Sequence, residues 1–450
     1  MRRASPALFC LNLSDKYAVL NCRMYQESLK GVIMSHNYRI RYKVMAVSAF
    51  VILSLAAALN SRAQWPLLDG TMSPYDFSSV DSTLPWGDDM KPVYINYVAR
   101  HGARFLSSEK KVADLKSALE AARKEGELSE KGEAFLSLLD TVVSATGDNW
   151  GALNSVGIME EKRLGQEMAA VAPSLLKNGK VEAISSYVPR VVMTMYELCH
   201  ELARCYSGIE VTTSEGKQFN PLMRYFTVDT AYVAYLKDGP WKSLYDSYAA
   251  KTLPAEPAKS MFKAGRAPDD SRLKKLSFDA YGVLQSLNAA EIRGDASEWF
   301  TEADYRRCWE VSNLRHYYQR SVSEVSSLPA KAAGPLLRDI ISKTDSAVAG
   351  KTNLAASLRF GHAETVIPLF ALMRLPGCYV PDASAGEVAA QWCDRDVSPL
   401  GANLMMVVLK ARSGEDYAAL RLNGKWVSIG NKKLMPWPEL RSLWESYMSE

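Results

Sequence analysis

A histidine lies between two arginines in residues 100–104, which read Arg-His-Gly-Ala-Arg. This segment follows the apolar run Val93–Val98, which predicts a buried strand, and ligands of open α/β sheets bind at the ends of such strands. Two guanidiniums four residues apart can bind one tetrahedral anion, because each makes paired hydrogen bonds to its oxygens. A histidine between them can reach the central atom of that anion. We therefore expect Arg100, His101 and Arg104 to form the centre of an anion site.

Charged and imidazole side chains also follow two other predicted strands. Arg190 comes shortly after the short strand predicted over residues 181–187, directly behind a proline that opens a helix. His362 and Glu364 follow the strand predicted over residues 354–360. If these strands run parallel in one sheet, all three sets of side chains meet at the same edge. A helix N-terminus at that edge also offers free backbone N–H groups to an anion.

These three strand ends supply three arginines, two histidines and one carboxylic acid. That set suits phosphoryl transfer through a covalent phosphohistidine. Arginines bind the phosphate dianion, a neutral imidazole can attack phosphorus, and an acid can protonate the leaving oxygen. Other interpretations remain for single residues. An acid such as Glu364 in the first turn of a helix is favoured by the helix dipole without any chemistry, and His362 by itself indicates little.

Metal binding finds little support in the sequence. His362-Ala363-Glu364 matches the first half of the zinc deaminase signature H-x-E…P-C-x-x-C, but the second half is missing because Cys378 and Cys393 lie 15 residues apart. We therefore expect neither a metal nor a cofactor. The cysteines beyond residue 63 number five, so at least one thiol stays free. Cys378 with Cys393 closes a short loop and is our first choice for a disulfide.

The surrounding elements predict an α/β fold, in which a mostly parallel sheet is flanked by helices and carries a smaller α-helical insertion domain. We assign residues 93–207 and 349–450 to the α/β domain, because apolar strand-like runs alternate there with helical spacing. Residues 208–348 show helical patterns with polar linkers and form the predicted insertion, which would cover the site. Residues 64–92 are rich in Pro, Ser, Asp and Gly and predict an irregular surface arm. Asn423-Gly424 between two short apolar runs predicts a β-hairpin.

The first 63 residues predict an N-terminal extension and a signal peptide, at about residues 34–63. Three basic residues precede the 16-residue apolar run Val44–Leu59, and small residues at 61 and 63 then suit cleavage before Gln64. The alternative is a membrane anchor that stays in place, although a spanning helix needs about 20 apolar residues. We expect an exported protein, periplasmic or secreted, with no stable membrane anchor after cleavage. Met34 is a plausible true start.

The charge balance changes once this leader is removed. The whole chain has a net charge of +4, but residues 1–63 hold nine basic and two acidic residues, so the remainder has a net charge of −3. The balance therefore gives no support for nucleic-acid binding. An anion site in the mature chain must be a local cluster of cations, and we expect a small polyanionic phosphoester as its partner.

Two short motifs resemble a known family. Residues 100–104 match the R-H-G-x-R signature of the histidine acid phosphatases, a branch of the histidine phosphatase superfamily. His362-Ala363-Glu364 replaces their more common His-Asp, and resembles the multiple inositol polyphosphate phosphatases, which degrade phytate. Further similar strings are Leu153–Gly157 before a helix, Ser186-Tyr187, and Arg224–Phe226. One departure is Leu106, where the family often has proline, and it affects the geometry of the loop and not the mechanism.

The resemblance implies a role for each site residue. His101 would be the nucleophile, and Glu364 would be the proton donor and then the base that activates water. The phosphate would be held by Arg100, Arg104, Arg190 and His362. The implied function is that of an exported phosphomonoesterase that hydrolyses inositol polyphosphates such as phytate through a phosphohistidine.

Two alternatives to this function stay open. Within the enzymes, the chain could be a broad histidine acid phosphatase that acts on sugar phosphates. Outside the enzymes, it could be a catalytically dead phosphate-binding protein on the same scaffold. The presence of both a nucleophile and a candidate acid argues against the binding protein, which would need only the arginines.

Overall fold

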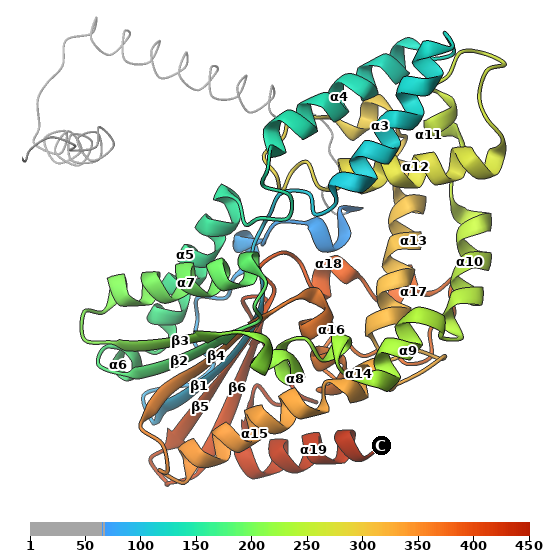
Figure 1. The fold of residues 1–450 in the computed structure, drawn as a ribbon. Coiled ribbons are helices and arrows are strands. Elements are labelled where there is room, and N and C mark those ends of the chain that lie inside the picture. The colour runs from blue at the N-terminus through green and yellow to red at the C-terminus, as the bar shows by residue number, and fades with distance from the viewer. Residues whose placement is uncertain (1–64, 66–67) are drawn as a thin grey trace, which may run out of the picture. The chain divides into compact units, whose positions relative to one another are not determined.

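The computed structural model describes residue 65 and residues 68–450 (Figure 1). The predicted signal peptide, residues 34–63, lies outside the described residues. Within the described part, no helix is long and apolar enough to cross a membrane. The predicted division into an α/β domain and an insertion stays a prediction, although several elements depart from it as described below.

An eight-stranded mixed sheet forms the centre of the described chain. Its order is β3-β2-β4-β1-β5-β6-β7, and β8 pairs with β6. The first four strands in this order run parallel, whereas β5, β6, β7 and β8 form antiparallel pairs. The α/β class is thereby confirmed, and the strands at the C-terminal end of the chain supply its antiparallel part. The strands are β1 (Met90–Arg100), β2 (Lys180–Ser185), β3 (Glu210–Glu215), β4 (Leu354–Gly361), β5 (Asn403–Ala411), β6 (Asp416–Leu422), β7 (Lys425–Val427) and β8 (Leu434–Pro436).

Strand β1 lies in the middle of the sheet and is buried on both faces. Its alternate residues enter two different cores: Tyr94 and Val98 face one, while Ile95 and Tyr97 face the other. Both faces need apolar side chains, which explains the continuous apolar run in the sequence. Arg100 is in register with Gly361 of β4, so the C-terminal ends of the two strands are level.

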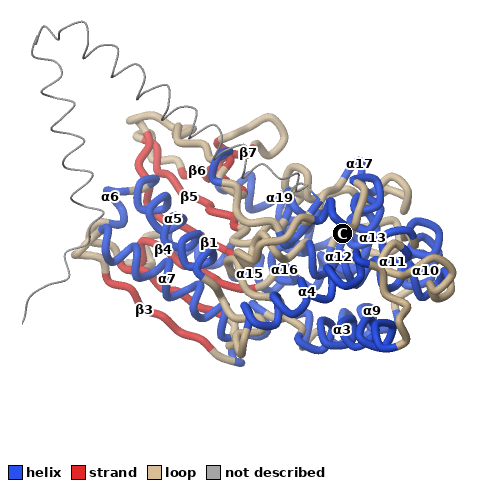
Figure 2. The backbone as a smooth tube through the Cα atoms, turned by 90° about the horizontal axis from the view of Figure 1, so that it is seen from above, coloured by secondary structure: helices blue, strands red, loops and turns tan. Residues whose placement is uncertain are grey.

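Helices cover both faces of the sheet (Figures 1 and 2). On one face α5 and α7 pack against each other and, with the short α6, close the core that holds Ile95 and Tyr97. On the other face lie α15, α16 and α19. These helices are α5 (Ser155–Val171), α6 (Pro173–Leu176), α7 (Pro189–Cys205), α15 (Gly334–Val348), α16 (Ala363–Leu372) and α19 (Trp437–Ser449).

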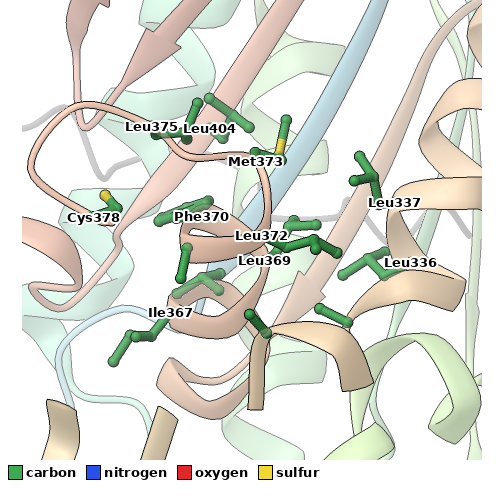
Figure 3. Close-up of a cluster of buried hydrophobic side chains, with 14 of the residues drawn as sticks. Leu336, Leu337, Ile367, Leu369, Phe370, Leu372, Met373, Leu375, Cys378 and Leu404 are labelled. Carbon is green, nitrogen blue, oxygen red and sulfur yellow. The ribbon is translucent and has the colours of Figure 1, made fainter. Parts of the chain in front are cut away.

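Helix α16 is almost completely buried, and this fixes the position of its first turn. Figure 3 shows Ile367, Leu369, Phe370 and Leu372 of α16 among apolar side chains that include Leu336 and Leu337 of α15. Each of the six side chains is at most 5% exposed. Burying a side chain of this size stabilises the fold by about 1.5–3 kcal/mol, so α16 cannot easily shift along or away from the sheet.

A helical layer lies at one end of the sheet (Figures 1 and 2). Its core joins α3 and α4, which precede β2, to α12 and α13, which follow β3. The layer contains α3 (Glu109–Lys124), α4 (Glu130–Thr146), α10 (Trp241–Thr252), α11 (Glu256–Lys259), α12 (Asp270–Leu284) and α13 (Glu302–Arg320). The remaining short helices are α8 (Asn220–Met223), α9 (Thr230–Asp238), α14 (Leu328–Ala332), α17 (Val388–Gln391) and α18 (Asp394–Val397).

The predicted all-helical segment 208–348 is therefore wrong in three details. Strand β3 lies inside it, α15 packs on the sheet, and α3 and α4 from outside it join the helical layer. Strand β3 carries no apolar signal in the sequence, because this edge strand reads Glu-Val-Thr-Thr-Ser-Glu and is exposed along much of its length.

Two other expectations also need correction. Residues 64–92 are irregular but are not all on the surface, since Leu68, Met72 and Tyr75 are buried. None of the five cysteines in the described residues forms a disulfide. Cys378 belongs to the core around α16 (Figure 3), whereas Cys393 packs on the core of the helical layer. The hairpin at Asn423-Gly424 is confirmed: it joins β6 to β7, and both residues have positive φ.

Candidate active site

His101 follows β1 directly and is fixed by backbone hydrogen bonds. Its N–H donates to the carbonyl of Gly361 at 3.1 Å, and its carbonyl accepts from the N–H of Gly401 at 3.0 Å. Nδ1 lies 2.9 Å from the carbonyl oxygen of Gly102. A carbonyl can only accept, so Nδ1 carries the ring proton and Nε2 keeps a free lone pair. Burial, and then the neighbouring Arg100, Arg190 and Arg104, hold the pKa of His101 well below its usual value, so the ring is neutral.

Three arginines surround this ring, and they lack anionic partners. Within the described residues, none of Arg100, Arg104 and Arg190 forms a salt bridge, and the Nε of each is buried without a hydrogen-bond partner. Arg100 is held by the carbonyl oxygens of Thr71 and Ser398, at 2.6 and 2.7 Å. Burial and neighbouring cations lower the pKa of Arg100, which shows how unfavourable the uncompensated charge is. An anion bound among the three guanidiniums would compensate these buried positive charges.

His362 is the residue before α16, and its ring lies close to that of His101. The two ring centroids are 5.8 Å apart at an interplanar angle of 78°. Nε2 of His362 lies 3.1 Å from the hydroxyl of Ser186 and 3.4 Å from Nη1 of Arg224. Burial lowers the pKa of His362 to about 3, so this ring is neutral too. Arg224 therefore brings a fourth guanidinium to the site.

Glu364 lies in the first turn of α16 and forms an ion pair with Arg320 of α13. Its Oε1 is 2.7 Å from Nη2 of Arg320, and its side chain is 33% exposed. Burial acts to raise the pKa of Glu364, but Arg320 and His362 outweigh it and hold this pKa well below its usual range. The structure therefore presents Glu364 as a carboxylate ion and not as a protonated acid.

A cavity of about 370 Å³ opens over these groups, between the sheet edge and the helical layer. This volume is within the range of small-molecule sites, at roughly 300–1,000 Å³. Five of the six predicted site residues line it, and His362 lies just behind them. Three further cations face the same space from α3 and α13, whereas the described residues supply two acids to it. The cations are Lys111, Arg315 and Arg320, and the acids are Asp279 and Glu364.

Helix α5 supports the loop that carries His101. The buried carboxylate of Glu160 accepts the backbone N–H of Ala103 at 2.7 Å and that of Tyr75 at 2.9 Å. Gly102 faces Gly157 of α5, and a Cβ on either residue would meet backbone atoms within 3.0 Å. The absence of two side chains thus lets the helix approach the loop.

The structure brings all six predicted site residues to one edge of the sheet, while their catalytic roles stay predictions. Sequence reasoning missed Arg315, Arg320 and Lys111 as cavity residues, because each is one of several charged residues on its helix and nothing in the sequence sets it apart. It noted the string at Arg224 without placing it in the site, and it missed the support from Glu160.

Known phosphatases are similar to this chain in sequence. The family model of the histidine phosphatase superfamily (branch 2) matches residues 241–423. The human multiple inositol polyphosphate phosphatase 1 is 24% identical over 367 residues, which cover 71% of this chain and 74% of that protein.

Solved structures share the fold. The multiple inositol polyphosphate phosphatase of Bifidobacterium longum in complex with phosphate has a TM-score of 0.73 at 16% identity, over 84% of this chain and 97% of that one. Its complex with inositol hexasulfate has a TM-score of 0.71 over the same shares and at the same identity. The phytase of D. castellii has a TM-score of 0.61 at 14% identity, over 85% of this chain and 84% of that one.

The fold is thus that of the histidine phosphatases. The family match over residues 241–423 and the similarity to the human phosphatase confirm the resemblance seen in the two motifs, and they support a histidine-type phosphomonoester hydrolase.

Proposed function

We propose that this phosphatase hydrolyses inositol polyphosphates such as phytate, with His101 as the nucleophile. The observation that carries the proposal is the free lone pair on Nε2 of His101, among three arginines that form no salt bridge with any described residue. The additional cations at the cavity wall suit a substrate with several phosphates. The matched proteins from human and from B. longum bear the name of multiple inositol polyphosphate phosphatases, and the latter was solved with inositol hexasulfate, which supports the same substrate class.

The reaction would take two steps. In the first, Arg100, Arg104 and Arg190 hold the phosphate oxygens while Nε2 of His101 attacks phosphorus. The bond from phosphorus to nitrogen forms, the ester bond from phosphorus to oxygen breaks, and Glu364 gives a proton to the leaving oxygen. In the second step the Glu364 carboxylate takes a proton from water. The water oxygen then attacks phosphorus, the bond to nitrogen breaks, and inorganic phosphate leaves.

Export belongs to this proposal. The leader pattern of residues 34–63 supports cleavage before Gln64 and release into the periplasm or the medium. Mass spectrometry of the protein recovered from the exported fraction should give a chain that begins at Gln64. A cell-associated protein that retains residues 34–63 would show an uncleaved anchor instead.

A substrate panel tests the activity. We expect the protein from Gln64 to Glu450 to release phosphate from phytate faster than from a sugar phosphate, in the presence of a chelator. A sugar phosphate as the better substrate would favour a broad acid phosphatase. Binding of phosphate without turnover would indicate a dead scaffold, and loss of activity with the chelator would contradict the metal-free mechanism.

Labelling tests the nucleophile. Rapid acid-free quenching after mixing with ³²P-labelled phytate should give a base-stable phosphoenzyme. The His101→Ala variant should show neither label nor turnover, whereas His200→Ala, a change at an exposed histidine of α7, should behave as the unaltered protein. A normal label in His101→Ala would exclude His101 as the nucleophile.

A further inference from the structure

The proton donor of the first step is in the wrong state for that step. A general acid must carry its proton when the ester bond breaks, but Glu364 is held as an ion by Arg320 at 2.7 Å. The other groups around it act in the same direction or are neutral. They are His362 on its own helix, Arg100 and Arg104 from the end of β1, Arg190 from α7, Arg315 from α13, and the hydroxyls of Tyr225 and Tyr232.

A ligand in the cavity can reach the Arg320 guanidinium and compete with Glu364 for it. Arg320 is the last residue of α13, its side chain is 15% exposed, and both it and Glu364 line the cavity. Within the described residues, Glu364 is its one hydrogen-bond partner. Arg315, on the same helix, faces the same cavity and has no carboxylate partner among the described residues. A phosphate dianion offers three acceptor oxygens and is a strong ligand for a guanidinium.

We propose that Arg320 is a substrate-controlled switch on Glu364. A second phosphate of the substrate binds Arg320 and Arg315, separates Arg320 from Glu364, and leaves that carboxyl free to hold a proton. The substrate class is a polyol that carries another phosphate beside the one under attack. This inference rests on the proposed function, because it assumes that Glu364 is the proton donor and that the substrate is polyphosphorylated.

The switch serves both steps of the reaction. While the substrate is bound, Glu364 takes a proton from solvent and passes it to the leaving oxygen as the bond from phosphorus to His101 forms. The alcohol product then leaves with its second phosphate, and Arg320 returns to Glu364. The restored carboxylate accepts a proton from the attacking water as the bond from phosphorus to nitrogen breaks. That proton returns to solvent when inorganic phosphate departs.

The test uses esters with a single phosphate, which cannot occupy Arg320 and the nucleophile together. For glycerol 2-phosphate, kcat/KM should fall above the pKa of Glu364, because that acid must be protonated. Removing a cation at hydrogen-bond distance raises a carboxyl pKa by about 1–3 units. Arg320→Gln should therefore move the falling limb of this profile up by about 1–3 pH units. Arg320→Lys, which keeps the charge, should move it less.

Matched measurements separate the switch from a structural role. Arg315→Gln should raise KM for phytate, and it should move the falling limb of the glycerol 2-phosphate profile less than Arg320→Gln does, because Arg315 forms no ion pair with Glu364 among the described residues. Aryl phosphates hardly need a proton on the leaving group, so Arg320→Gln should not shift their profile. With phytate, Arg320→Gln should raise KM without a gain in kcat. The switch would be overturned if Arg320→Gln left the falling limb of the kcat/KM profile for glycerol 2-phosphate unchanged. Equal losses of kcat/KM on all three substrates would also overturn it.

The unaltered protein keeps the two proposals apart. If it releases no phosphate from phytate, the proposed function fails. If it does so while Arg320→Gln leaves the limb in place, the proposed function stands and the switch alone fails.

Discussion

The replacement Gly157→Ala tests how closely helix α5 must approach the loop that carries His101. A Cβ at position 157 would lie 2.2 Å from the carbonyl oxygen and 2.8 Å from the nitrogen of Ala103. Ordinary contacts of this kind are 3.4–4 Å long. The new methyl group meets backbone and not the flexible end of a side chain, so either the loop or the helix has to move by about 1 Å.

The magnitude of each effect follows from this displacement. Overpacking of this kind lowers the unfolding free energy by about 1–3 kcal/mol. Alanine has a higher helix propensity than glycine, which raises the unfolding free energy by about 1 kcal/mol. We expect a net loss of about 0–2 kcal/mol. Catalysis should suffer more, because misplacing a reacting group by about 1 Å can lower the rate 10²-fold, and Ala103 is only two residues from His101.

Two measurements on one preparation check this prediction. Urea unfolding gives the change in unfolding free energy, and phosphate release from phytate gives kcat/KM, which should fall about 10²-fold. Gly282→Ala on α12 is the control for the unfolding measurement alone, because Gly282 lines the cavity; its Cβ would meet nothing within 4 Å and should raise stability by about 1 kcal/mol. A Gly157→Ala protein whose kcat/KM stays within about threefold of the unaltered value would refute the reasoning from close approach.

Three further predictions concern single side chains. Glu364→Gln should lower kcat/KM for glycerol 2-phosphate by about 10²–10⁴-fold but affect p-nitrophenyl phosphate far less, and equal losses would make Glu364 structural. Burial lowers the pKa of His316 to about 4 in the folded chain, below about 6.5 when unfolded, so unfolding binds protons in this window. The unfolding free energy should therefore fall as the pH drops from about 6.5 to about 4, and His316→Gln should flatten that slope in urea titrations. Glu160→Gln should lose one of two accepted backbone N–H groups and about 1–3 kcal/mol in the same titrations, whereas an unchanged midpoint would show that the loop has other support.

The centre of the site could be predicted because its signal is local. A strand buried on both faces must be an apolar run, and a cluster of charge that follows it at once has few purely structural explanations. His101 with its two neighbouring arginines follows this rule at the end of β1, and His362 with Glu364 follows it at the end of β4. The parallel register of the two strands then places both groups at one edge.

The remaining parts could not be predicted because their signal is not local. Arg320 ends a helix whose other residues are mixed polar and aromatic, and its partner on α16 lies more than 40 residues further along the chain. Strand β3 is defined by its hydrogen bonds to β2. The residues of β3 alone carry no sign of this pairing. The disulfide expected from a short loop failed because Cys378 and Cys393 enter two separate cores.

The adjacency of β1 and β4 also bears on when this protein becomes active. His101, the proposed nucleophile, and Glu364 lie about 260 residues apart in the chain, and they meet only when β4 has docked beside β1. Domains begin to fold while the chain is being made, but a pairing over such a distance comes late and is slow. A growing chain that ends before residue 364 therefore contains His101 but lacks Glu364, the proposed acid. Phosphatase activity thus reports that β4 has paired with β1 in the middle of the sheet, and it can serve as a measure of that step in refolding.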